Sequence, residues 1–119
     1  MILYIYSKCS TCQNALKFLE QRNISFIRKE ITDTPPTIAE LQQMLNFQND
    51  NLKKLFNTSG LLYKEMQMSK KLNGMSEREA LSLLSQNGML VKRPFLLGTS
   101  FGLVGFNESK WSETLGFLA

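Results

Sequence analysis

Two cysteines carry the clearest chemical signal in this sequence. They occur in Cys9-Ser10-Thr11-Cys12, directly after an apolar run at residues 2–6 and at the start of a helical pattern over residues 11–22. A strand that ends here presents the first cysteine to the N-terminus of the helix. Unpaired backbone N–H groups and the positive end of the helix dipole stabilise a thiolate at that position. Because a two-residue spacer lets the two sulfur atoms close a small ring, the pair is typical of a dithiol that cycles between thiol and disulfide.

The residues after the motif predict where the second thiol lies in the helix. The apolar residues follow the i, i+3, i+4 and i+7 spacing of one helix face: Cys12, Ala15, Leu16 and Leu19. Cys12 is therefore expected to lie one turn inside the helix, with Cys9 at its end. The neighbouring Lys8 adds positive charge that favours ionisation of Cys9.

Two other interpretations of the cysteine pair remain open. Cysteines also bind zinc, but a zinc site usually needs four Cys or His ligands, and this chain has 2 Cys and no His. One copy cannot complete such a site, which leaves a zinc ion shared between two copies. Alternatively, both thiols are buried and inert, because free cysteine packs as a small hydrophobic residue. The position between a strand and a helix favours redox chemistry over both.

The composition indicates one ordinary globular domain. The 119 residues are 43% hydrophobic and 20% charged, and no apolar run approaches the ~20 residues of a membrane-spanning helix. The N-terminus reads directly as a strand, without the features of a secretory signal. We therefore expect a cytoplasmic protein, where a single CxxC motif is more often catalytic or redox-sensing than structural.

The basic residues do not predict a nucleic-acid footprint. The net charge is +4, and basic pairs stand apart at residues 53–54, 70–71 and 92–93. We interpret them as solvated surface, and we expect neither direct nucleic-acid binding nor a membrane partner. The absence of histidine also removes the commonest general base. Any catalysis must therefore use cysteine, arginine, carboxylates or backbone amides.

Four short segments are expected to form one mixed sheet, at residues 2–6, 26–31, 95–97 and 101–104. The first two, joined by the helix at 11–22, predict a parallel, right-handed βαβ unit. The last two predict a hairpin. Asn107 is positioned to cap a final helix at 108–116 that buries Trp111 and Leu115, and both helices should pack on the sheet.

A long segment between the second and third strands is predicted to be mostly helical. Capping-box spacings mark two helix starts, Thr37 with Glu40 and Ser76 with Glu79. Apolar stripes follow the first start at Ile38, Leu41 and Leu45 and the second at Ala80, Leu81 and Leu84. Between them we expect a short helix at 52–56 and helical pieces over 61–72. Residues 37–88 are thus interpreted as a helical insertion within a single domain, residues 1–119.

This arrangement resembles the ArsC/Spx family, which contains arsenate reductases and Spx regulators. The resemblance covers nearly the whole chain and is greatest to small reductase-like members. It rests on Cys9–Cys12, Pro35-Pro36, LFNTSG at 55–60, GMLVKRP at 88–94 and VGFNE at 104–108. It implies an α/β, thioredoxin-like (glutaredoxin-type) fold, a four-stranded mixed sheet with an inserted helical subdomain.

The resemblance also implies roles for individual residues. Cys9 corresponds to the catalytic cysteine of the arsenate reductases, and Cys12 to the second cysteine of Spx, interpreted here as the resolving thiol. Arg93 corresponds to an anion-binding arginine beside that cysteine and is assigned to the catalytic group with them. Pro94 corresponds to a proline that is typically cis. The residues assigned to substrate binding are Lys8, Ser10, Thr11, Asn57, Arg93 and Pro94.

The helix dipole alone does not explain an activated Cys9. Lowering the pKa of a thiol by ~2 units needs roughly 2.7 kcal/mol of preferential thiolate stabilisation. A helix N-terminus supplies only about 0.3–1 kcal/mol at an exposed site and up to ~2 kcal/mol where it is partly buried. Hydrogen bonds to the thiolate, or a cation such as Arg93 or Lys8, must therefore supply the rest.

Two positions depart from the arsenate reductases. Those enzymes carry two further arginines around the oxyanion, where this chain has Asn57 and Gly105. Losing two guanidinium groups removes most of the bidentate recognition of an oxyanion. We therefore expect a thiol–disulfide reductase with no metal or other cofactor, acting on a protein or small-molecule thiol or disulfide. Glutathione, glutaredoxin and thioredoxin are the candidate electron donors.

The resemblance also supports an alternative function. Spx proteins are regulators that bind RNA polymerase and sense oxidants through a CxxC motif. In such a protein the disulfide would be a switch, and the charged surface of the helical insertion would be a docking surface.

Overall fold

The computed structural model describes residues 1–116, and its elements follow the predicted order. The strands are β1 (Ile2–Ile5), β2 (Ile27–Glu30), β3 (Phe95–Leu97) and β4 (Gly102–Val104). The α-helices are α1 (Ser10–Gln21), α2 (Ile38–Phe47), α3 (Leu61–Glu65), α4 (Met68–Lys71), α5 (Glu77–Gln86) and α6 (Glu108–Leu115). Three short 3-10 helices complete the chain: η1 (Leu52–Leu55), η2 (Leu72–Gly74) and η3 (Gly88–Leu90).

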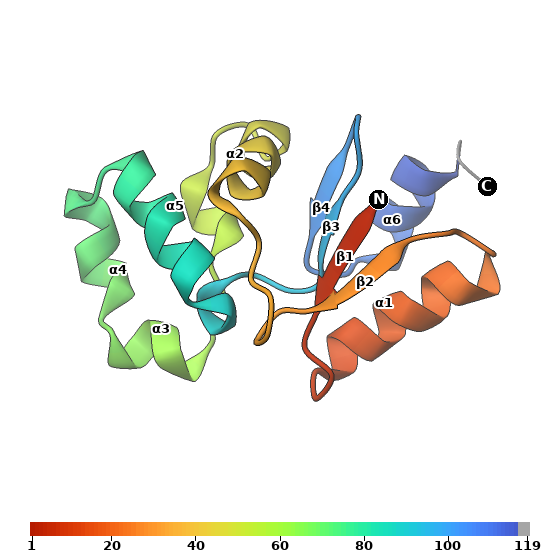
Figure 1. Cartoon of the computed structure of the whole chain (residues 1–119), viewed down its shortest axis with the longest axis horizontal. Coiled ribbons are helices and arrows are strands. Elements are labelled where there is room, and N and C mark those ends of the chain that lie inside the picture. Colours follow the sequence, from red (N-terminus) through yellow and green to blue (C-terminus); the bar gives the residue numbers. More distant parts are fainter. Residues whose placement is uncertain (117–119) are drawn as a thin grey trace.

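The strands of residues 1–116 form one four-stranded mixed sheet in the order β2-β1-β3-β4. β1 pairs in parallel with β2, as a βαβ unit requires, and antiparallel with β3. β3 and β4 form the expected antiparallel hairpin. The predicted α/β, thioredoxin-like sheet is confirmed. The region from 37 to 88 is helical, and Figure 1 shows its helices together at one end of the molecule.

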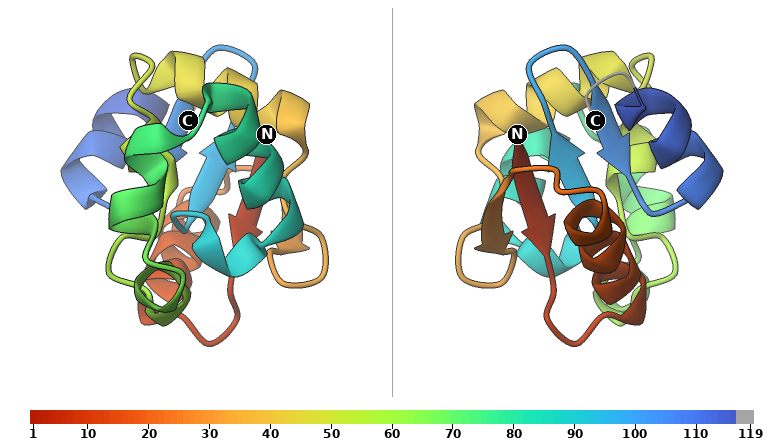
Figure 2. Two further views of the ribbon diagram at one scale, coloured as in Figure 1. Left: turned by 90° about the vertical axis from the view of Figure 1, so that its left-hand side faces the viewer. Right: turned by 90° about the vertical axis from the view of Figure 1, so that its right-hand side faces the viewer.

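The two faces of the sheet are covered by different helices (Figure 2). Because side chains alternate along a strand, Leu3 and Ile5 of β1 face α1 and α6, whereas Tyr4 faces the insertion. Trp111 and Leu115 of α6 are buried as predicted, and Asn107 caps that helix by accepting a hydrogen bond from the backbone N–H of Lys110 at 3.0 Å. None of the helices described is long and apolar enough to span a membrane.

A partly buried hydrogen bond joins the insertion to the central strand. Both predicted capping boxes form, and in the first the Glu40 carboxylate accepts from the backbone N–H of Thr37 at 2.9 Å. The same carboxylate oxygen accepts from the Tyr4 hydroxyl of β1 at 2.7 Å. Burial, followed by the hydrogen bond and the negative charge of Glu40, raises the pKa of Tyr4. The cap that starts α2 therefore also fixes where α2 sits on the sheet.

Three details differ from the sequence-based expectations. Helix α1 begins at Ser10, one residue earlier than predicted, because Cys9 is its N-cap. The short helix ends at Leu55, and Phe56 is extended and pairs with Val91 in an isolated β-bridge. Ile38 was predicted on the buried stripe of α2, but 46% of its surface is exposed. Ile38 is the first residue of α2 and lies outside the core, whereas Leu41 and Leu45, further along the same stripe, are buried in it.

We expect Gly88→Ala to destabilise the fold. Gly88 is buried, and an added Cβ would clash with the carbonyl oxygen of Ile31, the residue after β2. Backbone cannot move aside as a flexible side chain can, so the expected loss is about 1–3 kcal/mol. Urea unfolding followed by circular dichroism measures it.

Gly74→Ala is the matched control, because nothing lies within 4 Å of a Cβ added at that position. It should be neutral or slightly stabilising, since alanine restricts the unfolded chain more than glycine does. Equal unfolding free energies for the two variants would contradict the close approach of residues 31 and 88.

Candidate active site

Cys9 is the N-cap of α1. Its backbone is extended, at φ −96° and ψ 118°, and its Sγ accepts a hydrogen bond from the backbone N–H of Cys12 at 3.4 Å. Its carbonyl oxygen accepts from the N–H of Gln13 at 3.1 Å and so starts the helical ladder. The sulfur thus lies at the unpaired N–H groups of the helix terminus, as the motif predicted.

The loop that delivers Cys9 is fixed from three elements. Its own N–H donates to the carbonyl of Tyr6 at 3.0 Å, which closes a turn after β1. The N–H of Ser7 donates to the Glu30 carboxylate of β2 at 2.9 Å, and the Gln13 side chain of α1 donates to the carbonyl of Ser7 at 3.0 Å. The position of the sulfur is therefore set by hydrogen bonds rather than by a free loop.

The two thiols have opposite environments. Cys9 is half-buried, whereas Cys12 is completely buried. Burial tends to raise the pKa of Cys9, but hydrogen bonds from the Cys12 side chain and backbone, together with the charge and hydrogen bond of Arg93, lower it below the ordinary value. The pKa of Cys12 is raised to about 12, chiefly by burial and further by the adjacent Cys9, against the lowering effects of a backbone hydrogen bond from Tyr6 and the charge of Arg93. Cys9 is therefore the thiol that ionises first.

Arg93 supplies the cation beside Cys9. Its guanidinium carbon lies 5.1 Å from the centroid of the Tyr6 ring, and its Nη1 donates to the carbonyl of Met89 at 3.5 Å. Its buried Nε has no hydrogen-bond partner among the described residues. The guanidinium therefore keeps a free donor for a thiolate or a bound anion. The Arg93–Pro94 peptide bond is cis, as the resemblance implied.

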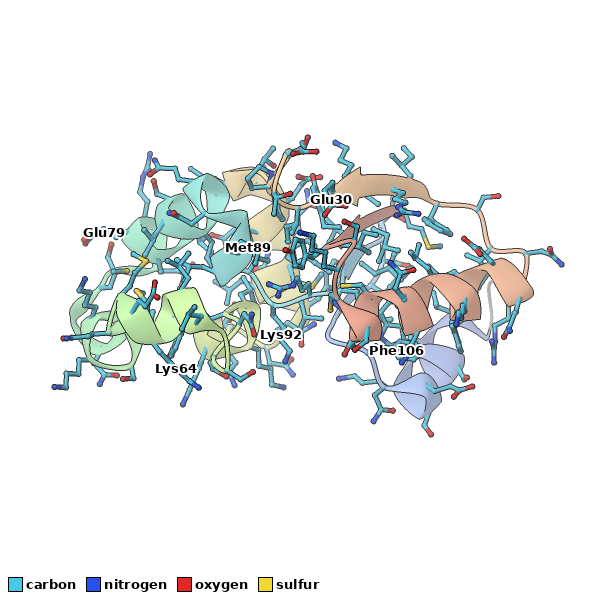
Figure 3. All side chains as sticks on the ribbon, turned by 90° about the horizontal axis from the view of Figure 1, so that it is seen from below. Glu30, Lys64, Glu79, Met89, Lys92 and Phe106 are labelled. Carbon is cyan, nitrogen blue, oxygen red and sulfur yellow. The ribbon has the colours of Figure 1, made fainter. Side chains whose placement is uncertain are left out.

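A cavity of about 260 Å³ opens at Cys9. Its walls come from the start of α1, the loop before α3, the loop before β3 and the turn after β4. In Figure 3, Lys92 lies between the insertion and the half of the molecule that contains α1 and Phe106. The lining residues are Cys9, Thr11, Asn57, Ser59, Lys92, Arg93, Gly105 and Phe106.

The predicted site residues separate into two groups. The cavity brings together Cys9, Thr11, Asn57 and Arg93, with Cys12 against Cys9. The others lie outside its lining: Lys8 and Ser10, which are exposed, and Pro94, which is buried. Lys8, unlike Arg93, is not among the groups that lower the pKa of Cys9.

Sequence reasoning missed several residues of this site. Ser59, Lys92 and Phe106 line the cavity, while Tyr6 and Met89 hold Arg93. Lys92 was visible in the Lys-Arg-Pro run, but it was interpreted as solvated surface. Tyr6 and Met89 gave no signal, because they act through a ring face and a backbone carbonyl.

The backbone conformation at Gly105 disfavours any other residue. Its φ is +70°, in the left-handed region, and an added Cβ would lie 3.2 Å from the Cε of Lys92. A larger residue here would strain the backbone and displace the lysine.

One observation bears on a metal. Within residues 1–116 no three His, Cys, Asp or Glu side chains are grouped so that they could hold an ion. The cysteine pair therefore gains no third ligand from the part of the chain described.

Comparison with known proteins gives the family. The sequence profile of the ArsC family matches residues 4–114. The chain belongs to the ArsC family. The uncharacterised protein YusI of Bacillus subtilis is 40% identical over 113 residues, which cover 95% of this chain and 96% of YusI. A crystal structure of an ArsC-family-related protein from Bacteroides fragilis has a TM-score of 0.87 and 43% identity, covering 94% of each chain.

Spx regulators are more distant relatives within the same comparison. The global transcriptional regulator Spx of Enterococcus faecalis is 26% identical over 110 residues, covering 92% of this chain and 82% of that protein. The resemblance to the ArsC/Spx family that the motifs indicated is thus confirmed.

We expect Cys9 to alkylate with an apparent pKa well below the value of about 8.5 for a free cysteine. Arg93→Ala should move this profile to higher pH, because the thiolate loses a nearby charge and a hydrogen bond. At neutral pH the variant should then react more slowly. Cys12 should stay slow throughout, because its pKa is raised to about 12. Iodoacetamide rates measured by peptide mass spectrometry across a pH series test each thiol.

Arg78→Ala is the matched control, since Arg78 is an exposed arginine of α5 outside the lining of the Cys9 cavity. It should leave the profile of Cys9 unchanged. A faster Cys12, or an Arg93→Ala profile equal to that of the control, would refute the assignment of Cys9 as the activated thiol.

Proposed function

We propose that this protein is a thiol–disulfide oxidoreductase in which Cys9 is the nucleophile and Cys12 is the resolving thiol. The observation that carries the proposal is the asymmetry of the pair. A half-buried thiol with a lowered pKa lines a cavity, and its buried neighbour has a raised pKa. A nucleophile needs ionisation and access, whereas a resolving thiol needs only proximity.

The first half-reaction joins one half of the disulfide substrate to Cys9. The Cys9 thiolate attacks one sulfur of a disulfide, a new S–S bond forms to Cys9, and the other substrate sulfur leaves as a thiolate. The N–H of Cys12 and the guanidinium of Arg93 hold the attacking sulfur and favour its ionised form.

The second half-reaction releases the remaining group. Cys12 loses its proton and attacks the sulfur of Cys9, which forms the Cys9–Cys12 disulfide and expels the second substrate thiolate. Two electrons have then passed from the protein to the substrate. Because the charge of Cys9 contributes to the raised pKa of Cys12, its loss in the mixed disulfide makes Cys12 easier to ionise at the step that needs it.

A further thiol must return two electrons to the oxidised protein. Glutathione, glutaredoxin and thioredoxin are the candidate donors, and all reduce a disulfide by the same exchange chemistry. We place the reaction in the cytoplasm, whose reducing conditions keep such a pair as thiols between turnovers.

The Spx relatives support a second candidate, a redox-sensing regulator that binds RNA polymerase. The supporting observation is that the match to an Spx regulator extends over 92% of this chain. In that function the Cys9–Cys12 disulfide changes binding to the polymerase instead of reducing a substrate.

Cys12→Ser should accumulate a mixed disulfide on Cys9, because the resolving attack is lost while the first attack remains. Incubation with a small disulfide, followed by intact-mass analysis, should show one adduct per chain. Cys9→Ser is the matched control and should form none. An adduct on the Cys9→Ser variant would mean that Cys12 is the nucleophile. The absence of an adduct on the Cys12→Ser variant would show that Cys9 is not the nucleophile.

The Cys12→Ser variant also separates the two candidate functions. Proteins captured from a lysate through a reducible bond to Cys9 favour the reductase. RNA polymerase that co-purifies without such a bond, and whose transcription changes on oxidation, favours the regulator.

Arsenate reduction is expected to be feeble or absent in assays coupled to glutaredoxin or thioredoxin. Among residues 1–116, Arg93 is the single arginine that lines the Cys9 cavity. The family resemblance implies that Asn57 and Gly105 stand where the arsenate reductases have arginine. One guanidinium holds an oxyanion far less firmly than three. Turnover at ordinary enzymatic rates, ~1–1000 per second, would show that this reasoning from Asn57 and Gly105 is wrong.

A further inference from the structure

A second cavity, of about 400 Å³, adjoins the Cys9 cavity and contains four lysines. We call it the lysine cavity. Its lining residues are Gln48, Asn51, Lys53, Lys54, Phe56, Thr58, Lys92, Val104 and Lys110. The basic pairs at 53–54 and 92–93 are separate in the sequence and were expected to be solvated surface, but folding brings Lys53, Lys54 and Lys92 to one cavity.

No carboxylate neutralises these lysines within the part of the chain described. The lining contains neither Asp nor Glu. The one ion pair found in residues 1–116 joins Arg22 to Glu108, and neither of these residues lines the lysine cavity. Four uncompensated positive charges around one hollow create a local potential that concentrates anions.

The lysine cavity and the Cys9 cavity lie on either side of one common wall. Lys92 lines both, and three neighbouring positions alternate between them, because Asn57 and Ser59 face the Cys9 cavity and Thr58 faces the lysine cavity. The shared wall is held by two backbone hydrogen bonds, from Asn57 N–H to the Leu90 carbonyl at 2.7 Å and from Lys92 N–H to the Leu55 carbonyl at 2.8 Å. A ligand in one cavity therefore borders the other.

The residue types select among anions. Arginine binds carboxylate and phosphate alike through its planar fork, whereas lysine binds phosphate as a point charge. Among the described residues the lysine cavity is lined by lysines without arginine, so it selects an anion by the amount of its negative charge rather than by planar geometry. Its volume lies within the roughly 300–1,000 Å³ range of small-molecule sites. Four charges match a ligand that carries more than one negative charge.

We propose that the preferred substrate is a small disulfide that carries phosphate groups, which the lysine cavity binds while the disulfide reaches Cys9. The inference rests on the proposed thiol–disulfide exchange and specifies its substrate class. Attack by Cys9 and resolution by Cys12 reduce the disulfide to two phosphate-bearing thiols and leave the Cys9–Cys12 disulfide. In the assay dithiothreitol supplies the two electrons that restore both thiols.

The test compares disulfides that differ in charge. Coenzyme A disulfide carries phosphates, glutathione disulfide carries carboxylates, and hydroxyethyl disulfide carries no charge. We expect the highest kcat/KM for coenzyme A disulfide. The double variant Lys53→Gln/Lys54→Gln should lower that value by about tenfold or more, since charge-assisted hydrogen bonds to phosphate are lost. The same variant should leave hydroxyethyl disulfide unaffected.

The double variant Lys70→Gln/Lys71→Gln is the matched control. It removes an equal charge from an exposed lysine pair on α4 that is not part of either cavity. It should leave every rate unchanged. Adenosine diphosphate should compete with coenzyme A disulfide and not with hydroxyethyl disulfide.

The outcomes separate this inference from the proposed function. Turnover of hydroxyethyl disulfide, without preference for coenzyme A disulfide or an effect of Lys53→Gln/Lys54→Gln, overturns the inference alone. The inference is also overturned if Lys53→Gln/Lys54→Gln lowers kcat/KM for glutathione disulfide as much as, or more than, it lowers kcat/KM for coenzyme A disulfide. The cavity would then not select phosphate. Absence of exchange with all three disulfides overturns both proposals.

Discussion

The hydrogen bond from the backbone N–H of Cys12 to the sulfur of Cys9 is the contact on which the rest of the site depends. An N-cap is normally a hydroxyl or carboxylate oxygen that satisfies a free N–H at the start of a helix. Here the capping atom is also the proposed nucleophile. The start of α1 is therefore defined by the group that is proposed to react, and the helix that Cys9 caps also buries its partner Cys12.

The insertion supplies part of the wall of the Cys9 cavity. The β-bridge between Phe56 and Val91 and the hydrogen bond from Tyr4 to Glu40 fix the insertion against the sheet. This brings Asn57 alongside the segment that carries Lys92 and Arg93. Without these contacts Cys9 would lie at an open edge, because the sheet and α1 supply only part of the wall.

The sequence was most informative where the physical cause is local. Short apolar strand segments, helix stripes and capping boxes each act within a few residues, so the sheet, α1 and the start of α2 could be predicted with errors of a residue or so at their ends. The exposure of Ile38 was missed, because a stripe does not show where the core ends.

The composition of the site was less accessible from sequence. Cys9, Cys12 and Arg93 could be found through the CxxC motif and the Lys-Arg-Pro run. The lysine cavity could not, because Lys53 and Lys92 are 39 positions apart in the sequence and meet only through the pairing of the two segments. Tyr6 and Met89 were hidden for a different reason, since their contributions do not depend on a charged or reactive side chain.

The left-handed backbone of Gly105 has an evolutionary consequence. A codon change to arginine at this position would bring the guanidinium only together with a strained φ, at a cost of roughly 1–2 kcal/mol, and with a displaced Lys92. The effect of that mutation depends on its background, because the turn after β4 and the lysine beside it must change as well. An arginine at position 105 would therefore reach the Cys9 cavity without this cost only if the turn after β4 and Lys92 changed with it.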